Sequence, residues 1–342
     1  MFDPLMGQGP LVVRRLTRLY PTIIRSARPA WGAIYHSTNN RPAFQALRLG
    51  FGGSVRRLIA DRTRALDPDL IVSVHPLLNH VTAVAMRRAG LSRPLITVVT
   101  DLIDFHLGWA CRESDMVVVP TEEARQVVLR HGVAPERVQL LGLPVDLDFR
   151  PPAPGEKHAL RRRFKLDEDR PTVLVTSGGD GSGGIIRQVR ALAWRAHPWQ
   201  LMVVCGRNQR LRSRLARVRF GTPTKVFGFV DNMPELMRAA DVVVGKAGPG
   251  AIAESLATGL PMIITTYLPG QETPNVRFVE DSGIGLYAPK PEELLAACET
   301  LLGGDGARLR DMASRAAAIA RPYASLDIAR VCLEHRRTPA GG

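Results

Sequence analysis

The 342-residue chain is predicted to adopt an α/β fold built from two doubly wound parallel-sheet domains in tandem. From about residue 69 onward, short β-branched runs alternate with helical patterns, which is typical of parallel strands joined by crossover helices. The runs are apolar throughout, as expected of strands covered on both faces. An Asp-led apolar strand followed by a helix occurs twice, at Asp115 and at Asp241. This near repeat favours two similar domains; the alternative is a single irregular α/β domain.

The individual elements follow from the same patterns. Strands are predicted at Leu70–Val74, Leu95–Val99, Met116–Val119, Val138–Leu141, Thr172–Thr176, Leu201–Cys205, Val242–Val244 and Met262–Thr265. Helices are predicted over residues 78–89, 121–131, 183–196, 208–218, 249–258, 291–302 and 306–320.

A proline-rich stretch at 149–156 predicts the linker, because proline cannot sit in a central strand and disfavours helix before it. The predicted division is a first domain over 1–150, a second domain over 151–325, and a carboxyl-terminal helix and tail over 326–342.

Composition restricts the class of protein. There are 46 Lys and Arg against 32 Asp and Glu, a net charge of +14, which favours an anionic partner such as nucleic acid, an anionic membrane or a phosphorylated substrate. The four cysteines are far apart in the sequence, so neither a zinc-type pair nor a disulfide framework is predicted, and a reduced, cytosolic compartment is expected. No apolar run of about 18 residues and no signal-peptide pattern is found, so any membrane contact is expected to be peripheral.

Two glycine-rich turns each close a predicted strand and open a predicted helix. Backbone amides in such turns approach an anion closely, and the helix N-terminus adds its dipole. Because parallel strands end at one edge of a sheet, both turns are expected to converge on one crevice. Either turn taken alone could be purely structural. The residues concerned are Gly178, Gly179, Asp180 and Gly181 in the first turn, and Lys246, Gly248, Pro249, Gly250 and Ala251 in the second.

Glu254 lies shortly after the second turn, near the start of its helix. A carboxylate is electrostatically favoured there and could accept hydrogen bonds from sugar hydroxyls. The alternative is an ordinary helix-start glutamate.

Three blocks, Gly228–Met237, Ala240–Glu254 and Gly259–Val276, resemble in order and spacing the diacylglycerol glycosyltransferases. These are the monogalactosyldiacylglycerol synthases and processive diacylglycerol glucosyltransferases, relatives of the peptidoglycan lipid N-acetylglucosaminyltransferase in glycosyltransferase family 28. The resemblance implies the GT-B fold, with two Rossmann-like domains facing across a cleft. It also implies that the carboxyl-terminal domain holds a UDP-sugar and the amino-terminal domain holds the lipid acceptor.

The resemblance assigns donor roles residue by residue. It implies that Phe229, Val230 and Met233 line the uracil pocket and that Glu254 holds the ribose hydroxyls. It also implies that both glycine turns contact the diphosphate and that Gln271 and Glu272 contact the sugar hydroxyls. Further donor contacts are expected at Arg207, Asn208, Lys246, Gly270 and Asn275, although Arg207 could equally be a solvated arginine. No DxD metal motif flanks either turn, so a transferase without metal or other cofactor is expected, with amides, a helix dipole and cations stabilising the departing UDP.

The segment Thr100–Trp109 matches the acceptor-domain signature of the same family. An attacking hydroxyl needs a general base within hydrogen-bond reach, so Asp101 is predicted as the base or its orienting group, with His106 as the second candidate. His75 is a further cleft candidate. The alternative is that Asp101 caps the following helix and His106 only packs.

The start of the chain departs from the family pattern. Family members open with an apolar strand and a Gly-Gly-Gly-His loop, and both are expected to be missing here, which places full activity in question.

Residues 1–64 hold eleven arginines against Asp3 and Asp61, a net +9. With apolar residues between them, Arg14, Arg15, Arg18 and Trp31 predict an interfacial patch for anionic lipid. The alternative is a solvated helix flanked by core residues. The predicted location is therefore the cytoplasmic side, peripheral on the inner face of the cell membrane.

The sequence thus predicts an enzyme that moves a hexose from UDP-glucose or UDP-galactose to diacylglycerol at an anionic membrane. Two alternatives stay open: transfer to another lipid such as a polyprenyl-linked saccharide, and an inactive, UDP-sugar-binding remnant. A nucleic-acid partner is not expected, because no nucleic-acid-reading module is recognised.

Overall fold

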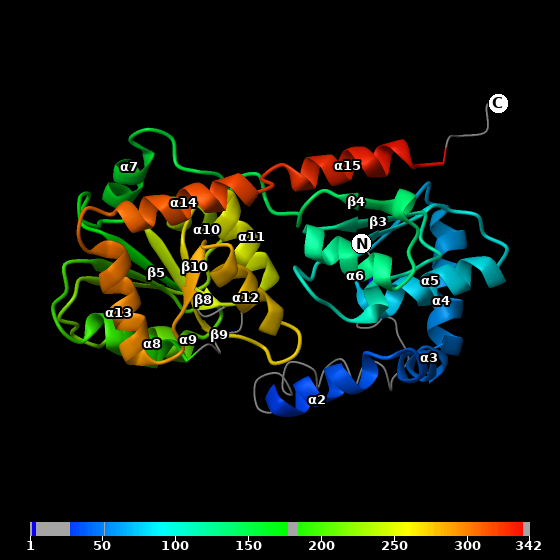
Figure 1. Cartoon of the computed structure of the whole chain (residues 1–342), viewed down its shortest axis with the longest axis horizontal. Coiled ribbons are helices and arrows are strands. Elements are labelled where there is room, and N and C mark those ends of the chain that lie inside the picture. Colours follow the sequence, from blue (N-terminus) through cyan, green and yellow to red (C-terminus); the bar gives the residue numbers. More distant parts are fainter. Residues whose placement is uncertain (1, 5–27, 51, 177–183, 338–342) are drawn as a thin grey trace. The chain divides into compact units, whose positions relative to one another are not determined.

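The structure, a computed structural model, describes residues 2–4, 28–50, 52–176 and 184–337 (Figure 1). The chain divides into two compact units. The first comprises 1–144, 268–274 and 324–342, and the second comprises 145–267 and 275–323. The first break therefore falls six residues before the predicted boundary at 150. The segment 268–274 and the last helix both belong with the first unit, whereas the sequence assigned 268–274 to the donor domain.

The first unit is a four-stranded parallel sheet with helices on both faces, in the order β1-β2-β3-β4. Its elements are α2 (Arg28–Thr38), α3 (Arg41–Gly50), α4 (Gly52–Leu66), β1 (Ile71–Ser73), α5 (Pro76–Arg88), β2 (Leu95–Val98), the 3-10 helix η1 (Leu107–Trp109), β3 (Met116–Val119), α6 (Glu122–Arg130), the 3-10 helix η2 (Pro135–Arg137), β4 (Val138–Leu140) and α15 (Ala324–Glu334).

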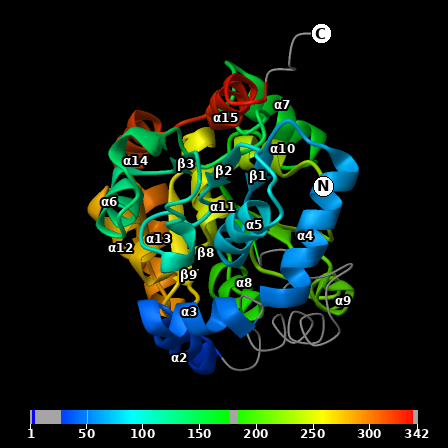
Figure 2. The same cartoon turned by 90° about the vertical axis from the view of Figure 1, so that its right-hand side faces the viewer.

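Two apolar layers cover this sheet. On one face Val117 and Val119 pack with Trp109 and with Val127 of α6. On the other face strand residues pack against Ile328 and Val331 of α15, which lies next to the sheet in both views (Figures 1 and 2). Helices α4 and α5 lie side by side and share a smaller apolar cluster. Because both faces are covered, β2 and β3 are buried along their whole length, as their apolar runs predict.

The second unit is a six-stranded, wholly parallel sheet in the order β10-β9-β8-β5-β6-β7. Its elements are α7 (Glu156–Arg163), β5 (Thr172–Thr176), α8 (Ile185–Ala193), β6 (Gln200–Val204), α9 (Gln209–Leu215), β7 (Thr224–Phe227), α10 (Met233–Ala239), β8 (Val242–Lys246), α11 (Pro249–Thr258), β9 (Met262–Thr266), α12 (Thr273–Asp281), β10 (Gly285–Tyr287), α13 (Pro291–Leu302) and α14 (Ala307–Ile319).

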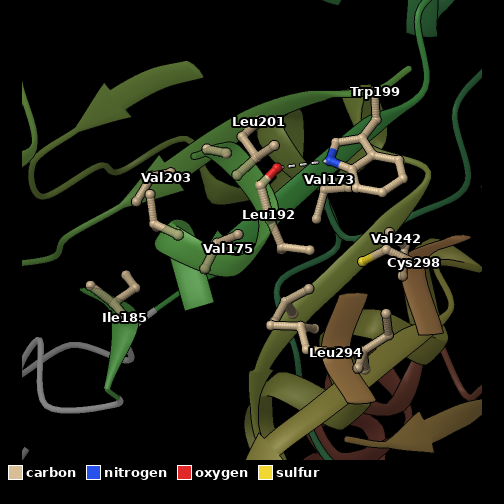
Figure 3. Packing of buried hydrophobic residues seen from close by; sticks show 14 of the residues in the cluster. Val173, Val175, Ile185, Leu192, Trp199, Leu201, Val203, Val242, Leu294 and Cys298 are labelled. Atoms are coloured by element: carbon tan, nitrogen blue, oxygen red, sulfur yellow. Dashed lines mark hydrogen bonds between the residues drawn. The ribbon is translucent and has the colours of Figure 1, made fainter. Parts of the chain in front are cut away.

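The core of this unit contains Trp199, whose ring is 1% exposed (Figure 3). Its indole N–H donates to the carbonyl of Leu192 at 3.2 Å, which satisfies the one polar group of the ring (Figure 3). Leu192 of α8 and Leu294 of α13 lie with it against the β5 and β6 side chains (Figure 3). This layer therefore joins two helices that are about a hundred residues apart in the sequence.

The predicted elements agree with the observed ones to within a few residues, but several were missed. Edge strands β7 and β10 carry polar residues or span only three residues, so they lack the long apolar run that predicts a central strand. Helix α7 has six charged or histidine side chains in eight residues, so its packing face gives little periodic signal. Helices α10 and α12 span only seven and nine residues, so they also give little periodic signal and were missed.

The repeated Asp-led strand has a direct structural meaning. In the first sheet the backbone N–H of Leu95 donates to the Asp115 carboxylate at 2.8 Å, and the Asp115 N–H donates to the Leu95 carbonyl at 2.9 Å. In the second sheet Thr172 and Asp241 make the same reciprocal pair, at 2.7 and 2.9 Å. Each aspartate thus joins the starts of two neighbouring parallel strands and holds their register.

Asp241 has a second task, because its carboxylate also accepts from Lys157 at 2.9 Å and from Arg161. The Arg161 side chain is only 5% exposed, and its guanidinium also donates to the carbonyls of Ala239 and Glu168. Helix α7 is therefore held against the strand starts by a largely buried ion pair.

We expect Asp241→Ala to destabilise the second unit by about 3–5 kcal/mol, because it leaves a buried guanidinium without its counter-charge and frees the Thr172 amide. Urea unfolding followed by tryptophan fluorescence measures the change. Asp311→Ala, which removes an exposed ion pair with Arg315, serves as the control and should cost no more than about 1 kcal/mol. Equal midpoints for the two variants would contradict the role of Asp241.

Candidate functional site

Apart from Gly270, Gln271 and Glu272, the predicted donor residues that the structure describes belong to the second unit and lie at or after the carboxyl ends of β6, β7, β8 and β9. Parallel strands place their carboxyl ends at the same edge, which is where open α/β sheets bind ligands. The first glycine turn, with Gly178, Gly179, Asp180 and Gly181, falls outside the described residues. The second turn is described in full.

In the second turn, Gly248 is the N-cap of α11 and Pro249 is its first residue. The cap provides no side-chain hydrogen bond, so the first amides of the helix are available to an anion. Gly250, in the first turn of the helix, has no neighbouring atom within 4 Å of where a Cβ would lie. The turn is anchored by Asn275, which is 2% exposed and donates from Nδ2 to the Ala247 carbonyl at 3.0 Å. Asn275 therefore stabilises the turn through this hydrogen bond, whereas the sequence analysis expected it to contact the donor.

Glu254 follows Gly250 by four residues, which puts both on one face of α11. Burial raises the pKa of the Glu254 carboxyl to about 7. The sequence predicted that the helix dipole would favour the carboxylate, but that benefit is confined to the first turn, and desolvation prevails at this position. Within the described residues no cation pairs with Glu254. Its carboxyl is thus a half-buried group able to accept a hydroxyl hydrogen bond.

The predicted uracil residues include one exposed aromatic ring. Phe229 is 57% exposed, and the guanidinium carbon of Arg207 lies 4.9 Å from its ring centroid. A flat pyrimidine could stack on such a ring, with the Arg207 cation close to a bound anion. Val230 and Met233, which follow Phe229 closely in the sequence, are half-buried. Asn208, in contrast, caps α9, since its Oδ1 accepts from the Leu211 amide at 2.9 Å.

Lys246 is the last residue of β8 and the first residue of the second glycine turn, and it is half-buried. This places one more cation in the part of the second unit where the sequence predicts a diphosphate.

Asp101 lies in the first unit, just after β2, and its side chain is buried. Its Oδ2 accepts from the indole N–H of Trp109 at 2.8 Å, and its Oδ1 accepts from the amide of Gln271 at 2.9 Å. Burial raises the pKa of Asp101, while the two hydrogen bonds and the neighbouring His75 oppose that rise. Asp101 is thus held by two side chains rather than serving as a simple helix cap.

His106 is bound at both ring nitrogens. Its Nδ1 accepts from the Gly108 amide at 3.1 Å, and its Nε2 lies 3.3 Å from the Thr38 hydroxyl. Since Thr38 donates its proton to the Ile34 carbonyl at 2.8 Å, the neutral His106 carries its proton on Nε2 and donates to Thr38. Burial lowers the pKa of His106, which agrees with a neutral ring. The geometry therefore favours a capping and packing role for His106.

His75 has a similar arrangement at the start of α5. Its Nδ1 accepts from the Leu77 amide at 3.2 Å, and burial lowers its pKa. It too is a helix cap in the described structure.

The loop that contains Gly270, Gln271 and Glu272 packs within the first unit. Gly270 has a positive φ of 85°, a conformation that favours glycine. A Cβ there would also lie only 3.2 Å from the ring of Tyr35, so both backbone conformation and space favour glycine at this position. Glu272 is 3% exposed and accepts from the Leu268 amide at 2.7 Å. Gln271 and Glu272 were expected to contact the donor sugar. In the structure Gln271 donates to Asp101 and Glu272 accepts from Leu268, both within the first unit.

Two residues of this region were missed as site residues. Trp109 was part of the recognised signature but received no role, and it is the donor to Asp101. Tyr35 is buried beside His106 and Gly270, with a pKa raised by burial and by the charge of Asp101. Its only sequence signal was an aromatic residue on an amphipathic helix.

The predicted membrane arginines, Arg14, Arg15 and Arg18, fall outside the described residues. Trp31 is half-buried on α2. In the described part of the chain no helix has both the length and the apolar character needed to cross a bilayer.

Comparison with solved structures establishes the fold. MurG of Acinetobacter baumannii superposes with a TM-score of 0.59 at 16% identity, covering 82% of this chain and 79% of that one. Anabaena HepE, solved in complex with UDP, superposes with a TM-score of 0.57 at 19% identity and 82% coverage of both chains. Both share the GT-B glycosyltransferase architecture of two parallel-sheet units, as the resemblance implied.

Sequence comparison identifies the family. Residues 1–145 match the Monogalactosyldiacylglycerol (MGDG) synthase family, and residues 172–317 match the Glycosyltransferase family 28 C-terminal domain. A probable chloroplastic monogalactosyldiacylglycerol synthase of Glycine max is 34% identical over 93% of this chain, which spans 62% of that relative's length. A probable monogalactosyldiacylglycerol synthase 2 of Oryza sativa subsp. japonica is 33% identical over 95% of this chain and 71% of its own. The chain therefore belongs to the monogalactosyldiacylglycerol synthase family of glycosyltransferases.

Proposed function

We propose that this chain transfers a hexose from a UDP-sugar to diacylglycerol at a membrane surface. The observation that carries the proposal is on α11: an N-terminus without a side-chain cap and, on the same face, the half-buried Glu254, which pairs with no cation in the part of the chain that the structure describes. A diphosphate suits the first feature and ribose hydroxyls suit the second. Family membership supplies the acceptor class, and the names of the relatives favour galactose as the hexose.

In this reaction the acceptor hydroxyl attacks the anomeric carbon of the hexose. The bond between that carbon and the UDP oxygen breaks, a new carbon–oxygen bond to the lipid forms, and the hydroxyl proton passes to a base. The amides of Gly250 and Ala251 and the α11 dipole would stabilise the charge developing on UDP. Neither a metal ion nor another cofactor is part of this proposal.

Asp101 is the proposed base. Each carboxylate oxygen can accept two hydrogen bonds, so Trp109 and Gln271 leave one accepting position on each oxygen. The raised pKa makes Asp101 a stronger base than an exposed aspartate. His106 is less suited, because its Nδ1 lone pair is occupied by the Gly108 amide and its Nε2 carries the proton.

We expect Glu254→Gln to weaken UDP-galactose or UDP-glucose binding by about 1–3 kcal/mol, the range of a lost charge-assisted hydrogen bond. The wild-type affinity should rise as the pH is raised through about 7, because ribose hydroxyls donate to the ionised carboxylate and the free carboxyl has a pKa of about 7. Isothermal titration calorimetry across this range checks both.

Glu254→Gln is itself the control for other titrating groups, and its pH profile should be flat where that of the wild type rises. The phosphates of a UDP-sugar keep their charge over this range. Parallel profiles for the two proteins would remove Glu254 from the ribose role.

We expect Asp101→Asn to lower turnover by about 10²-fold or more while leaving UDP affinity unchanged, because the base is lost but the donor site is intact. The assay follows radiolabelled hexose from UDP-galactose and UDP-glucose into diacylglycerol, with a polyprenyl-linked saccharide as the competing acceptor. Asp104→Asn, an exposed acid three residues away, should leave turnover nearly unchanged. Undiminished turnover in Asp101→Asn would exclude it as the base.

Membrane binding is proposed to be peripheral, at the cytoplasmic face, through Arg14, Arg15, Arg18 and Trp31. We expect vesicle binding to increase with anionic lipid and to decrease with salt, since surface attraction is screened within about 8 Å at physiological ionic strength. Co-sedimentation of the triple Arg→Glu variant should show weaker binding. Equal binding of the wild type to neutral and anionic vesicles would refute the electrostatic patch.

A further inference from the structure

One cluster in the first unit combines three metal-ligating side chains. His80 is on α5, and Cys111 and Glu113 lie in the turn between η1 and β3. One ligating atom from each lies within 4.8 Å of the other two. His80 Nδ1 is 3.5 Å from Glu113 Oε2, and Cys111 Sγ is 3.6 Å from the same oxygen. None of the three belongs to the proposed donor or acceptor residues.

The histidine of this cluster is unusually placed. Its side chain is 9% exposed, yet among the described residues neither ring nitrogen has a hydrogen-bond partner. Buried polar groups in folded proteins are almost always hydrogen-bonded, because an unpaired one has lost its water without compensation. The ring edge meets Phe44 at a centroid distance of 5.3 Å, and His80 Nδ1 lies 3.5 Å from Glu113 Oε2, which is longer than a normal hydrogen bond. A cation between these groups would supply the missing partner.

The distances suit a zinc ion. Zinc bonds to nitrogen, sulfur and oxygen are about 2.0–2.3 Å long, so tetrahedral ligand atoms lie about 3.3–3.8 Å apart. The two observed distances to Glu113 fall within this range. Thiolate with imidazole favours zinc over magnesium or calcium, which prefer oxygen ligands. The Glu113 side chain is 35% exposed, so water can reach a fourth position.

From this geometry we infer that His80, Cys111 and Glu113 form a zinc site that fastens α5 to the turn after η1. Helix α5 already contacts η1, directly before that turn, through a hydrogen bond from Asn79 Nδ2 to the Gly108 carbonyl at 3.2 Å. That turn follows Trp109, the hydrogen-bond donor to Asp101. The ion would be structural: it holds the segment that positions Asp101 and touches no reacting atom.

The test uses the purified 342-residue chain after chelation, titrated with Co²⁺ and then with Zn²⁺. We expect one Co²⁺ per chain, with the near-ultraviolet absorption of a thiolate–cobalt bond, and displacement by Zn²⁺. Cys111→Ser should abolish that absorption. Glu113→Gln and His80→Gln should each weaken Zn²⁺ binding at least about 10-fold in competition with a chromogenic chelator. Even mutation of residues that only hydrogen-bond to metal ligands lowers metal affinity by about 10–100-fold.

Cys332→Ser is the matched control, because Cys332 is a free cysteine on α15 outside the cluster. It should keep the cobalt absorption and the wild-type Zn²⁺ affinity. Far-UV circular dichroism checks folding, and the partly exposed Glu113→Gln decides the matter if Cys111→Ser does not fold. A wild type without the thiolate–cobalt band, or with the same Zn²⁺ affinity as Glu113→Gln, would show an ion pair and thiol hydrogen bond only.

Discussion

The register of the two parallel sheets depends on one repeated interaction, the aspartate that precedes β3 or β8. A parallel pair has no hairpin to set its alignment, so a one-residue slip would exchange the two faces of a strand. Asp115 and Asp241 prevent this by bonding reciprocally to the first residue of the neighbouring strand, through carboxylate and amide together. Because the strand starts are aligned, their carboxyl ends also align, and the residues after β2 and β8 reach one edge of each sheet.

Desolvation controls the chemistry at both edges. Burial raises the pKa of Glu254 in the second unit and of Asp101 in the first, but the surroundings differ. Glu254 has no cation partner among the described residues, so the pKa of its carboxyl stays at about 7 and the carboxyl can accept a hydrogen bond from a ligand hydroxyl. Asp101 has two hydrogen-bond donors that restore part of its acidity and fix its orientation. One carboxyl is therefore suited to binding and the other to proton transfer.

The contact between Gln271 and Asp101 bears on the role of the Pro-Gly-Gln-Glu loop at 269–272. The loop leaves β9 of the second unit and packs within the first. A glutamine that orients a base and a glutamine that touches a sugar predict different kinetics: the first changes turnover and its pH profile, and the second changes donor affinity. The inferred zinc site would act on the same carboxyl through the turn that follows Trp109.

The sequence by itself determined the α/β class, most of the central strands, both glycine turns and the family, because these depend on local composition and on short motifs. Only the tertiary structure decided that Gln271 reaches Asp101, 170 residues away, and that α15 returns to cover the first sheet. It also assigned His106, His75 and Asn208 to helix caps and left Glu254 without a cation partner among the described residues. These outcomes depend on which side chains meet and how much water is excluded, and neither is set until distant segments pack together.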